Sequence, residues 1–311
     1  WLASTNRNES LQLISQEKYI ELDGDGNILR QIDFPRYTFD FPRPIMNDKY
    51  LVLGYEDYDI DPQGAFLTKV QDIEGQFAPA IINHRDYLPN DLNNLRFYGP
   101  IGAINDRNQL LMNYHLVSEK KVQYLLFDIN VQNDSLALSL ARSFSMPGQT
   151  RYDYTEFIKS VGSSFLIQPQ SSSDDASIYL VDASGEPTKV LSGELYGYFE
   201  CQDTLFASVG GQLASNDQYI HYSVDGAKSW QPYFAGEELG PFSPKLAVGD
   251  IVVYSPLNRD GLFYTNDFRT EKPISMAGLP ENAYVGLMNF YEGQYVLVSG
   301  GYLYRRTSLD D

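Results

Sequence analysis

Arginines and tyrosines occur together in several connections between the expected strands of this 311-residue chain. A guanidinium group can hold a carboxylate through two parallel hydrogen bonds, and an aromatic ring can stack on a ligand. These residue types therefore suit a glycan or an anionic ligand. The alternative is that the arginines pair with nearby carboxylates and the tyrosines pack between strands. The candidate ligand-binding residues are Arg36, Tyr37, Arg43, Arg85, Arg96, Tyr98, Arg151, Tyr152, Tyr154 and Arg259.

Motifs with catalytic or metal-binding spacing are scarce in the sequence. His84, His115 and His221 lack the spacing of metal ligands, and no nucleophile-elbow serine or phosphate-binding glycine loop occurs. Cys201 is the only cysteine, so no intramolecular disulfide can form, and we expect a small buried side chain there. We assign no catalytic residue, metal or cofactor. Paired carboxylates for glycoside hydrolysis can still come from loops that are distant in the sequence.

Two acidic clusters are compatible with calcium or with a plain turn. An EF-hand loop that began at Asp57 would need glycine at its sixth position and glutamate at its twelfth, but these positions are Pro62 and Thr68. We therefore expect solvated turns at both places, with calcium as the alternative. The clusters are Asp57, Asp59 and Asp61 in one connection, and Asp23, Asp25 and Asn27 in another.

The chain is strongly acidic, with 23 Lys and Arg residues against 41 Asp and Glu residues and a net charge of −18. Binding to nucleic acid needs a stripe of basic residues on the phosphates, so this charge argues against a nucleic-acid partner and against an anionic membrane surface. No apolar run approaches the ~18 residues that span a bilayer, so we expect no membrane insertion.

The beginning of the chain and its composition bear on its compartment. The sequence starts at Trp1 rather than at methionine, which predicts that an upstream segment has been removed. Together with many Tyr, Asn, Asp and Gln residues, this favours a periplasmic, cell-surface or secreted protein. An apolar content of 43% can form a sizeable core. We expect one domain over residues 1–311, a monomer, and a glycan or an envelope protein as the partner.

A pair of strands recurs along the whole chain: a short apolar strand, then a second strand that usually ends at an Asp and often at a Gly. This pattern occurs seven times, at a spacing of about 40 to 58 residues that is typical of four-stranded propeller blades. We predict an all-β fold with almost no helix, a single β-propeller of seven four-stranded blades, with six blades as the alternative. The second strands begin near Tyr19, Phe66, Tyr124, Ile178, Tyr219, Leu262 and Tyr302.

The order of strands predicts how the ring closes and where its loops lie. The last unit lacks a fourth strand, and WLAST from Trp1 can supply it, so we expect the N- and C-terminal strands to pair. If the strands of a blade run A to D outward, the D to A and B to C connections open on one face. The A to B and C to D connections open on the other face. The Arg- and Tyr-rich connections are all D to A or B to C, so we expect them to share a face.

The clearest local motif is SVDGAKSW, from Ser223 to Trp230. It resembles the Asp box, or BNR repeat, Ser-x-Asp-x-Gly-x-Thr-Trp, with Asp225 in place and Gly226 one position early. TNDFRT from Thr265 resembles a degraded second copy. The resemblance implies a β-propeller whose boxes are structural turns between third and fourth strands, where the Asp accepts turn N–H groups and the Trp is buried beside the blade. Comparable turn positions are expected for Asp23, Asp72, Asp128 and Asp182.

Asp-box propellers include sialidases, which bind a substrate carboxylate with three arginines and typically carry an early Arg-Ile-Pro motif. The sequence here departs from that motif, because Pro44 directly follows Arg43. A fold is not evidence of chemistry. The expected function is therefore a non-enzymatic binding module that recognises a glycan or a protein partner on the Arg and Tyr face. The alternative is a propeller glycoside hydrolase or lyase, sialidase-like, that acts on an acidic glycan.

Overall fold

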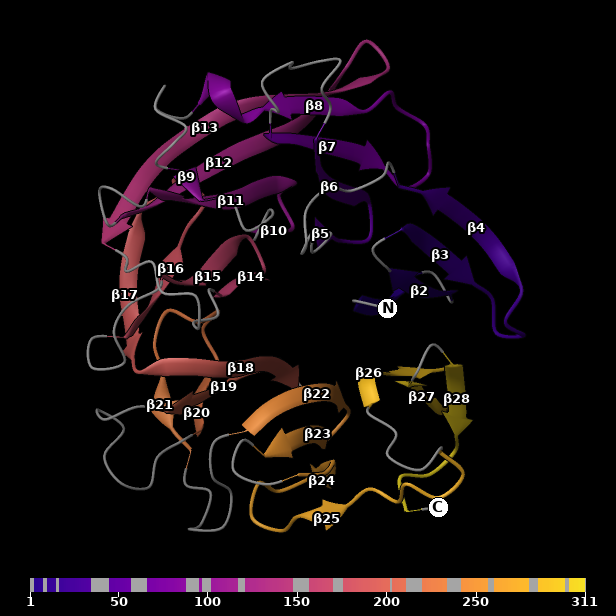
Figure 1. The fold of residues 1–311 in the computed structure, drawn as a ribbon. Coiled ribbons are helices and arrows are strands. Elements are labelled where there is room, and N and C mark those ends of the chain that lie inside the picture. Colours follow the sequence, from indigo (N-terminus) through magenta and orange to yellow (C-terminus); the bar gives the residue numbers. More distant parts are fainter. Residues whose placement is uncertain are drawn as a thin grey trace. The chain divides into compact units, whose positions relative to one another are not determined.

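The computed structural model of the protein is built from β-strands (Figure 1). Within the described residues the one helix is the short 3-10 helix η1 (His84–Asp86), which confirms the prediction of an all-β fold. The structure describes residues 3–7, 10–14, 17–34, 45–56, 66–87, 95–96, 102–116, 121–147, 157–169, 176–201, 203–210, 220–233, 242–256, 260–279, 285–299 and 302–310.

The first three sheets follow one another along the chain. The first contains β1 (Ala3–Arg7), β2 (Ser10–Ile14), β3 (Lys18–Leu22) and β4 (Ile28–Asp33). The second contains β5 (Ile45–Met46), β6 (Tyr50–Glu56), β7 (Phe66–Asp72) and β8 (Ala80–Asn83). The third contains β10 (Gly102–Ile104), β11 (Gln109–Leu116), β12 (Lys121–Gln132) and β13 (Ser135–Pro147), with β9 (Leu95–Arg96) added to β11.

Four further sheets complete the described strands. The fourth contains β14 (Phe157–Val161), β15 (Ser164–Gln168), β16 (Ser177–Val181) and β17 (Pro187–Ser192). The fifth contains β18 (Glu194–Cys201), β19 (Thr204–Gly210), β20 (Ile220–Ser223) and β21 (Gln231–Pro232). The sixth contains β22 (Phe242–Val248), β23 (Ile251–Pro256), β24 (Phe263–Thr265) and β25 (Lys272–Pro273). The seventh contains β26 (Val285–Tyr291), β27 (Gln294–Ser299) and β28 (Tyr302–Arg306).

In every sheet the main path follows chain order with antiparallel pairing, so each sheet is a meander; β9 is the exception, since it pairs with β11 and not with β10. Seven successive sheets confirm the prediction of seven blades rather than six. By internal contacts the chain divides into two compact units. One unit contains residues 1–33 and 193–311, with the first, fifth, sixth and seventh sheets. The other contains residues 34–192, with the second, third and fourth sheets.

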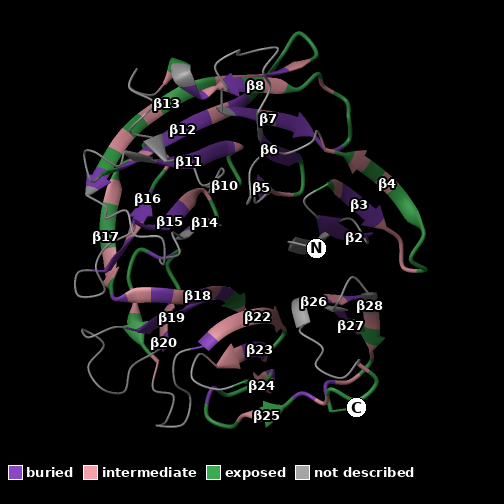
Figure 2. Ribbon diagram, in the orientation of Figure 1, coloured by how far each residue is buried: buried purple, intermediate pink, exposed green. Residues whose placement is uncertain are grey.

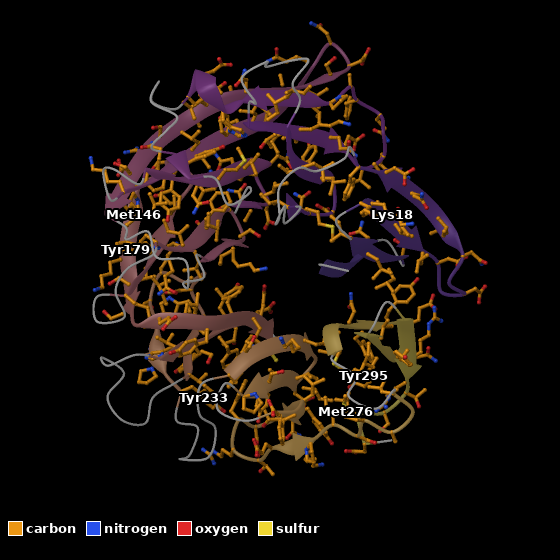
Figure 3. The ribbon with its side chains drawn as sticks, viewed as in Figure 1. Lys18, Met146, Tyr179, Tyr233, Met276 and Tyr295 are labelled. Carbon is orange, nitrogen blue, oxygen red and sulfur yellow. The ribbon has the colours of Figure 1, made fainter. Side chains whose placement is uncertain are left out.

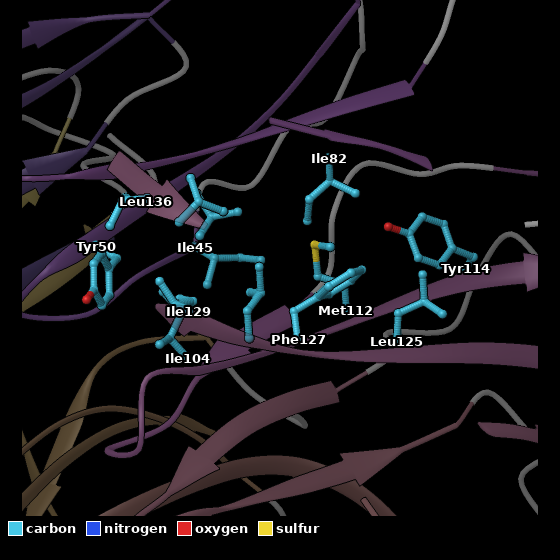
Figure 4. Close-up of a cluster of buried hydrophobic side chains, with 13 residues drawn as sticks. Ile45, Tyr50, Ile82, Ile104, Met112, Tyr114, Leu125, Phe127, Ile129 and Leu136 are labelled. Atoms are coloured by element: carbon cyan, nitrogen blue, oxygen red, sulfur yellow. The ribbon is translucent and has the colours of Figure 1, made fainter. Parts of the chain in front are cut away.

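The core of the unit of residues 34–192 lies between its sheets. Thirteen buried side chains of the second and third sheets form one cluster (Figure 4). Val52, Val70, Met112 and Phe127 of this cluster are fully buried. Burying an aliphatic or aromatic side chain of this size contributes about 1.5–3 kcal/mol. Leu111, the neighbour of Met112, packs on the opposite face with the fourth sheet. The strand is therefore apolar on both faces, which explains its continuous apolar run.

A second cluster joins the third and fourth sheets of this unit. It includes Phe165 and Val181, with Met146 of β13 and Tyr179 of β16 packed toward the outer strands (Figure 3). Burial within each sheet follows strand order, because the middle strands are mostly buried, whereas β4 and the part of β13 between Leu136 and Met146 contain exposed and partly buried residues (Figure 2).

Aromatic packing dominates the fifth and sixth sheets of the other unit. The rings of Phe199 and Phe206 stack with centroids 5.1 Å apart, and the ring of Phe268 lies 5.0 Å from that of Phe206. The sixth and seventh sheets share a separate cluster that includes Leu297 and the C-terminal Leu309. These clusters explain why pairs of apolar strands recur along the sequence.

The expectation that the N-terminal strand completes the last sheet is wrong. Ala3–Arg7 pairs with Ser10–Ile14 and is the first strand of its own sheet, and the described seventh sheet has three strands. The first and seventh sheets meet instead through a cluster of Leu11, Leu13, Tyr291 and Val296. The cause is local, because the connection after Arg7 is short. Closing a hairpin with Ser10–Ile14 therefore costs less conformational entropy than pairing with the distant end of the chain.

Candidate functional site

Most of the predicted ligand-binding residues lie outside the described part of the chain. Arg85 is placed by its backbone in η1, and Arg96 by its backbone in β9. These two positions are the ones at which the structure informs the predicted site, and the remainder stays a prediction. The residues outside the described part are Arg36, Tyr37, Arg43, Tyr98, Arg151, Tyr152, Tyr154 and Arg259, together with the acidic Asp57, Asp59 and Asp61.

Strand β9 places Arg96 at a defined corner of the third sheet. It pairs with the end of β11, where Arg96 stands opposite His115 in register. Strand β10 pairs with the beginning of β11, where Ala103 stands opposite Leu111. Because β12 occupies the other edge of β11, β9 and β10 share the first-strand edge. By backbone register Arg96 and His115 are therefore cross-strand neighbours at one end of this sheet, and His115 lies within β11 rather than in the connection that follows it.

A buried polar group lies at the start of the same connection. His84, 1% exposed, follows β8 directly; its Nε2 lies 2.7 Å from Thr68 Oγ1, and its Nδ1 is hydrogen-bonded to the Tyr114 hydroxyl. Whichever ring nitrogen carries the proton, one hydroxyl donates and the other accepts. Thr68 lies on β7 and Tyr114 on β11, so His84 connects the second sheet to the third. This bond network anchors the backbone that leads into Arg85.

Burial makes this network electrically neutral. Desolvation lowers the pKa of His84 to about 3 and raises the pKa of Tyr114. A general acid or base works best when its pKa lies near the working pH. His84 and Tyr114 are therefore suited to holding the two sheets together rather than to proton transfer.

The turn from Ser223 to Trp230 lies between β20 and β21, the third and fourth strands of the fifth sheet. The Asp225 carboxylate accepts the backbone N–H of Ser229 at 3.0 Å and the Ser229 hydroxyl at 2.6 Å. Ser223 Oγ donates to Asp225 at 2.8 Å and accepts the N–H of Ala227 at 3.0 Å. The predicted turn position and N–H acceptance of Asp225 are confirmed. Trp230 is half-buried, less than predicted, and its Nε1 donates to the Ala227 carbonyl at 3.1 Å.

A second turn repeats these bonds between β24 and β25. Asp267 Oδ1 accepts the N–H groups of Arg269 and Thr270 at 2.8 Å each. Thr265 Oγ1 donates to Asp267 at 3.2 Å and accepts the N–H of Phe268 at 3.0 Å. Hydrogen bonds lower the pKa of each carboxyl to about 2. The largest contribution comes from the Ser229 hydroxyl for Asp225 and from the Thr270 backbone N–H for Asp267. Both turns are therefore held by an ionised carboxylate at neutral pH.

Of the four other aspartates that were predicted to lie at turns, three predictions are confirmed and one is wrong. Asp23 accepts the N–H groups of Asp25 and Asn27, and Asp182 accepts the N–H of Ser184 at 2.8 Å. The Asn27 side chain and the Ser184 hydroxyl, respectively, are the main causes of the lowered pKa of each carboxyl. Asp72 accepts the N–H groups of Glu74 and Gln76. The Asp128 prediction is wrong, because this residue lies inside the long strand β12 and accepts from Gln109 Nε2 at 2.9 Å.

The environment of Cys201 is that of a structural side chain. Cys201 is half-buried, its Sγ lies 2.7 Å from the Gly249 carbonyl, and burial raises the pKa of its thiol. No group of three or more His, Cys, Asp and Glu residues that could hold a metal ion occurs within the described ranges. Over the same part of the chain, no helix has the length and apolar character needed to cross a membrane.

Sequence reasoning missed the two partners of His84. Thr68 and Tyr114 are polar-headed side chains at fully or almost fully buried positions of apolar strands. A buried hydroxyl costs free energy unless it is hydrogen-bonded. The signal that could have revealed the network is therefore a polar residue at an inward position of a predicted strand, although its partner comes from another sheet.

Comparisons with known proteins identify the fold. No protein-family model and no curated protein sequence matches the chain. The β-propeller domain of the Trilobed protease from Pyrococcus furiosus, with an open velcro topology, is similar at 12% identity and a TM-score of 0.53, over 99% of this chain and 97% of that one. Virginiamycin B lyase from Staphylococcus aureus is similar at 11% identity and a TM-score of 0.53, over 95% and 90%. Pyrococcus horikoshii acylaminoacyl peptidase, of which the chain spans 52%, is similar over 99% of this chain at 12% identity and a TM-score of 0.54. The chain has the fold of a seven-bladed β-propeller.

Proposed function

We propose that this chain is a non-enzymatic β-propeller binding module of the cell envelope or exterior. It recognises a glycan or a protein partner through its Arg- and Tyr-rich connections. All of the candidate ligand-binding residues except Arg259 belong to the unit of residues 34–192. The second, third and fourth sheets therefore carry the main part of the proposed site.

The observation that carries the proposal is the difference between the two ends of these sheets. At one end the A to B turns are short and held by side chains: Asn47 Oδ1 accepts the N–H of Tyr50 at 2.8 Å, and Asn105 Oδ1 that of Gln109 at 2.9 Å. Binding residues occur preferentially on loops that a rigid scaffold positions. The connections at the opposite end span residues 57–65, 84–101, 117–120, 148–156 and 169–176.

The placement of Arg96 supports the same end as the binding end. Its backbone lies at the first-strand edge of the third sheet. In a propeller this edge borders the central channel, where loops of several blades converge. A guanidinium group at this corner can reach a ligand held by neighbouring connections, as bidentate recognition of a carboxylate requires.

We also propose that the turns at Asp225 and Asp267 are Asp-box turns with a structural role. Their support is the shared set of bonds from hydroxyl and backbone donors to one carboxylate. Both turns join third to fourth strands, at the end of the sheet opposite to the binding connections. We therefore expect Asp225→Ala to lower the melting temperature by about 2–4 °C and to leave ligand affinity of the folded protein unchanged.

The proposal is tested by removing one Arg and Tyr pair from the binding end. The double substitution Arg96→Ala and Tyr98→Ala should weaken binding by about 30-fold, or ~2 kcal/mol, in a glycan array or an envelope-protein pull-down followed by titration. Arg107→Ala is the matched control, because Arg107 is exposed in the A to B turn at the other end of β11. Equal binding by the double variant and the wild type would reject the proposed site.

Analysis of the bound glycan for reaction products separates the binding module from the enzymatic alternative. A glycoside hydrolase or lyase would release a free sugar or an unsaturated product from a bound acidic glycan. Mass spectrometry of bound glycans after prolonged incubation with the wild-type chain should show them unchanged. Product that disappears in the Arg96→Ala and Tyr98→Ala variant would establish the enzyme instead.

A further inference from the structure

The seventh sheet ends one strand earlier than the others. Each of the other six described sheets has a fourth strand that pairs antiparallel with its third. In the seventh sheet β28 is the outermost strand, paired with β27 on one edge, and no described strand pairs with its other edge (Figure 1). An edge of this kind offers a row of backbone N–H and C=O groups to another strand.

The described end of the chain does not return along this edge. The Leu309 carbonyl accepts the Ser275 N–H at 3.2 Å, and the side chain of Leu309 is buried in the cluster of the sixth and seventh sheets. The Tyr264 hydroxyl, on β24, donates to the Asp310 carboxylate at 2.6 Å. The residues that follow β28 therefore run to the sixth sheet and are held there.

Two arginines at the end of β28 place one cation on each face of the seventh sheet. Arg305 is exposed, and its Nη1 donates to the Gly24 carbonyl, in a turn of the first sheet, at 2.6 Å. Arg306 donates to the carbonyls of Ser275 and Ala277, which follow the sixth sheet. Successive strand residues point to opposite faces, as these bonds require. In a chain with a net charge of −18, this edge is a local basic site that favours an acidic partner.

Exposed apolar side chains lie on both sides of the same edge. Ile28 begins β4 directly after the turn that receives one guanidinium group. It stands opposite Leu22, which packs toward the seventh sheet, and directly opposed residues share a face. Ile28 and Leu29 are 58% and 59% exposed. Met276 lies between the two carbonyls that receive the other guanidinium group and is 39% exposed (Figure 3). Exposed apolar residues that gather in one place mark an interaction site.

We propose that β28 is a docking edge for an extended acidic segment of another protein, which adds antiparallel as the fourth strand of the seventh sheet. In strand addition the main-chain bonds give affinity, and alternate side chains give specificity. The added strand places carboxylates opposite Arg305 and Arg306 and apolar side chains toward Ile28 and Met276. A second β28 would bring four arginines together, so the charge selects a different, acidic chain. This edge is separate from the Arg- and Tyr-rich connections, and the two proposals can fail independently.

A short peptide tests the edge directly. The probe is fluorescein-labelled SDEVIVS with an amidated C-terminus, whose Asp and Glu lie opposite Arg306 and Arg305 in antiparallel pairing. Fluorescence anisotropy with the wild-type chain should show saturable binding. The peptide SKKVIVS should bind at least about 10-fold more weakly, because its lysines face the arginines. No binding of SDEVIVS, or equal affinity for the two peptides, would overturn the proposal.

Exchange of the charge on β28 tests which group recognises the peptide. Arg305→Glu should bind SDEVIVS at least about 10-fold more weakly than the wild type and SKKVIVS more tightly, a reversal that a misfolded variant does not give. Arg107→Glu is the matched control, because it makes the same change at an exposed turn of the third sheet, and it should keep the wild-type preference. An unchanged preference in Arg305→Glu, or loss of both peptides, would contradict the proposed contact.

The apolar contact is tested on β4. Ile28→Asp should weaken SDEVIVS binding by about 10-fold, since it places a carboxylate beside an acidic peptide. Ile81→Asp is the matched control, because Ile81 is 49% exposed on the outer strand β8 of the second sheet, and it should bind like the wild type. Equal binding by the two variants would remove Ile28 from the docking site.

Hydrogen exchange with mass spectrometry locates the added strand. Saturating SDEVIVS should slow exchange in peptides that cover Tyr302–Arg306, because the outward N–H groups of β28 gain partners. Exchange in β8 and β13, on the other unit, should not change. Unchanged exchange in β28, or protection that appears only elsewhere, would show that the peptide does not pair with this edge.

Discussion

In each of the turns at Asp225 and Asp267, one hydroxyl both donates and accepts a hydrogen bond. Ser223 and Thr265 both donate to an aspartate two residues later and accept a backbone N–H further on. The glycine of the Asp-box pattern corresponds to Ala227, which has a φ of +67°, in the left-handed region that glycine adopts without strain. The bonds of the turn therefore hold a non-glycine residue in the conformation that the pattern would assign to glycine.

His84 gives the stability of the protein a specific pH dependence. Its pKa is lowered to about 3 in the folded state, against 6.5 for an ordinary histidine. Between these values the unfolded chain binds a proton that the folded chain does not, so stability is greatest above pH 6.5 and falls as the pH is lowered. The group should contribute a loss of about 2 kcal/mol between pH 7 and pH 5.

The variant His84→Gln tests this pH dependence. Glutamine does not titrate, so the free energy of unfolding of the variant should fall less between pH 7 and pH 5 than that of the wild type, by about 2 kcal/mol. Urea denaturation at the two pH values measures the difference. The variant is expected to be less stable than the wild type at pH 7, because Thr68 and Tyr114 lose their shared partner. Parallel losses in the two proteins would show that His84 is not neutral in the folded state.

At the scale of elements, the hairpin of β12 and β13 connects the third sheet to the second. Its tip reaches the turn before β8, where the Ala78 N–H donates to the Asp134 carbonyl at 3.0 Å and the Leu136 N–H donates to the Ala78 carbonyl at 2.8 Å. The side chain of Leu136 is 5% exposed and belongs to the cluster shared with the second sheet. Both backbone and side-chain contacts therefore extend the third sheet over the second.

Leu136→Ala should strongly weaken the contact between this hairpin and the second sheet. Removal of a buried leucine leaves a cavity, and we expect a loss of about 2–4 kcal/mol in the free energy of unfolding. Val131→Ala is the matched control, because Val131 faces Leu136 in the register but is 47% exposed, and it should cost less than about 1 kcal/mol. Chemical denaturation measures both, and similar losses would contradict the packing described for the hairpin tip.

At the scale of the whole chain, its beginning and its end meet by packing rather than by sharing a strand. The first and seventh sheets share a buried cluster that includes Leu13 and Tyr291. Arg305 Nη1 adds a hydrogen bond of 2.6 Å to the Gly24 carbonyl. The end of the chain is fixed separately, because the Ser275 N–H donates to the Leu309 carbonyl at 3.2 Å. This junction depends on side-chain fit, so it should be sensitive to a single truncation.

Leu13→Ala is expected to loosen the junction locally before the rest of the chain. The cavity should reduce protection from hydrogen exchange in peptides that cover β1, β2, β26 and β27, at a cost of about 2–4 kcal/mol. Leu136→Ala is the complementary control, whose loss of protection should begin within residues 34–192. Hydrogen exchange with mass spectrometry distinguishes the two patterns. Uniform loss over the chain in both variants would mean that the junction does not open on its own.

The sequence by itself determined the all-β class, the seven strand pairs and the position of Asp225 in a turn where it accepts a backbone N–H. These features depend on alternation along a strand and on bonds between residues close in sequence, so their physical causes are visible in a short window. The same reasoning placed Arg96 in a connection that leaves the same end of its sheet as the connection after His115. The wider ligand-binding site remains a prediction from sequence, because most of its residues lie outside the described part.

Tertiary structure decided the features that depend on competing partners. Ala3–Arg7 could complete either the first sheet or the last, and the strand pattern is equally suitable for both, so the short hairpin and the packing of Leu13 on the last sheet settled the choice. The sequence of β12 contains an Asp that looked like a turn, but Asp128 stays in the strand because Gln109 of the neighbouring strand bonds to it. His84 became a structural residue only when Thr68 and Tyr114 came from two sheets to meet it. Burial and hydrogen bonding between distant segments cost or contribute free energy only after the sheets assemble, so no local pattern records them.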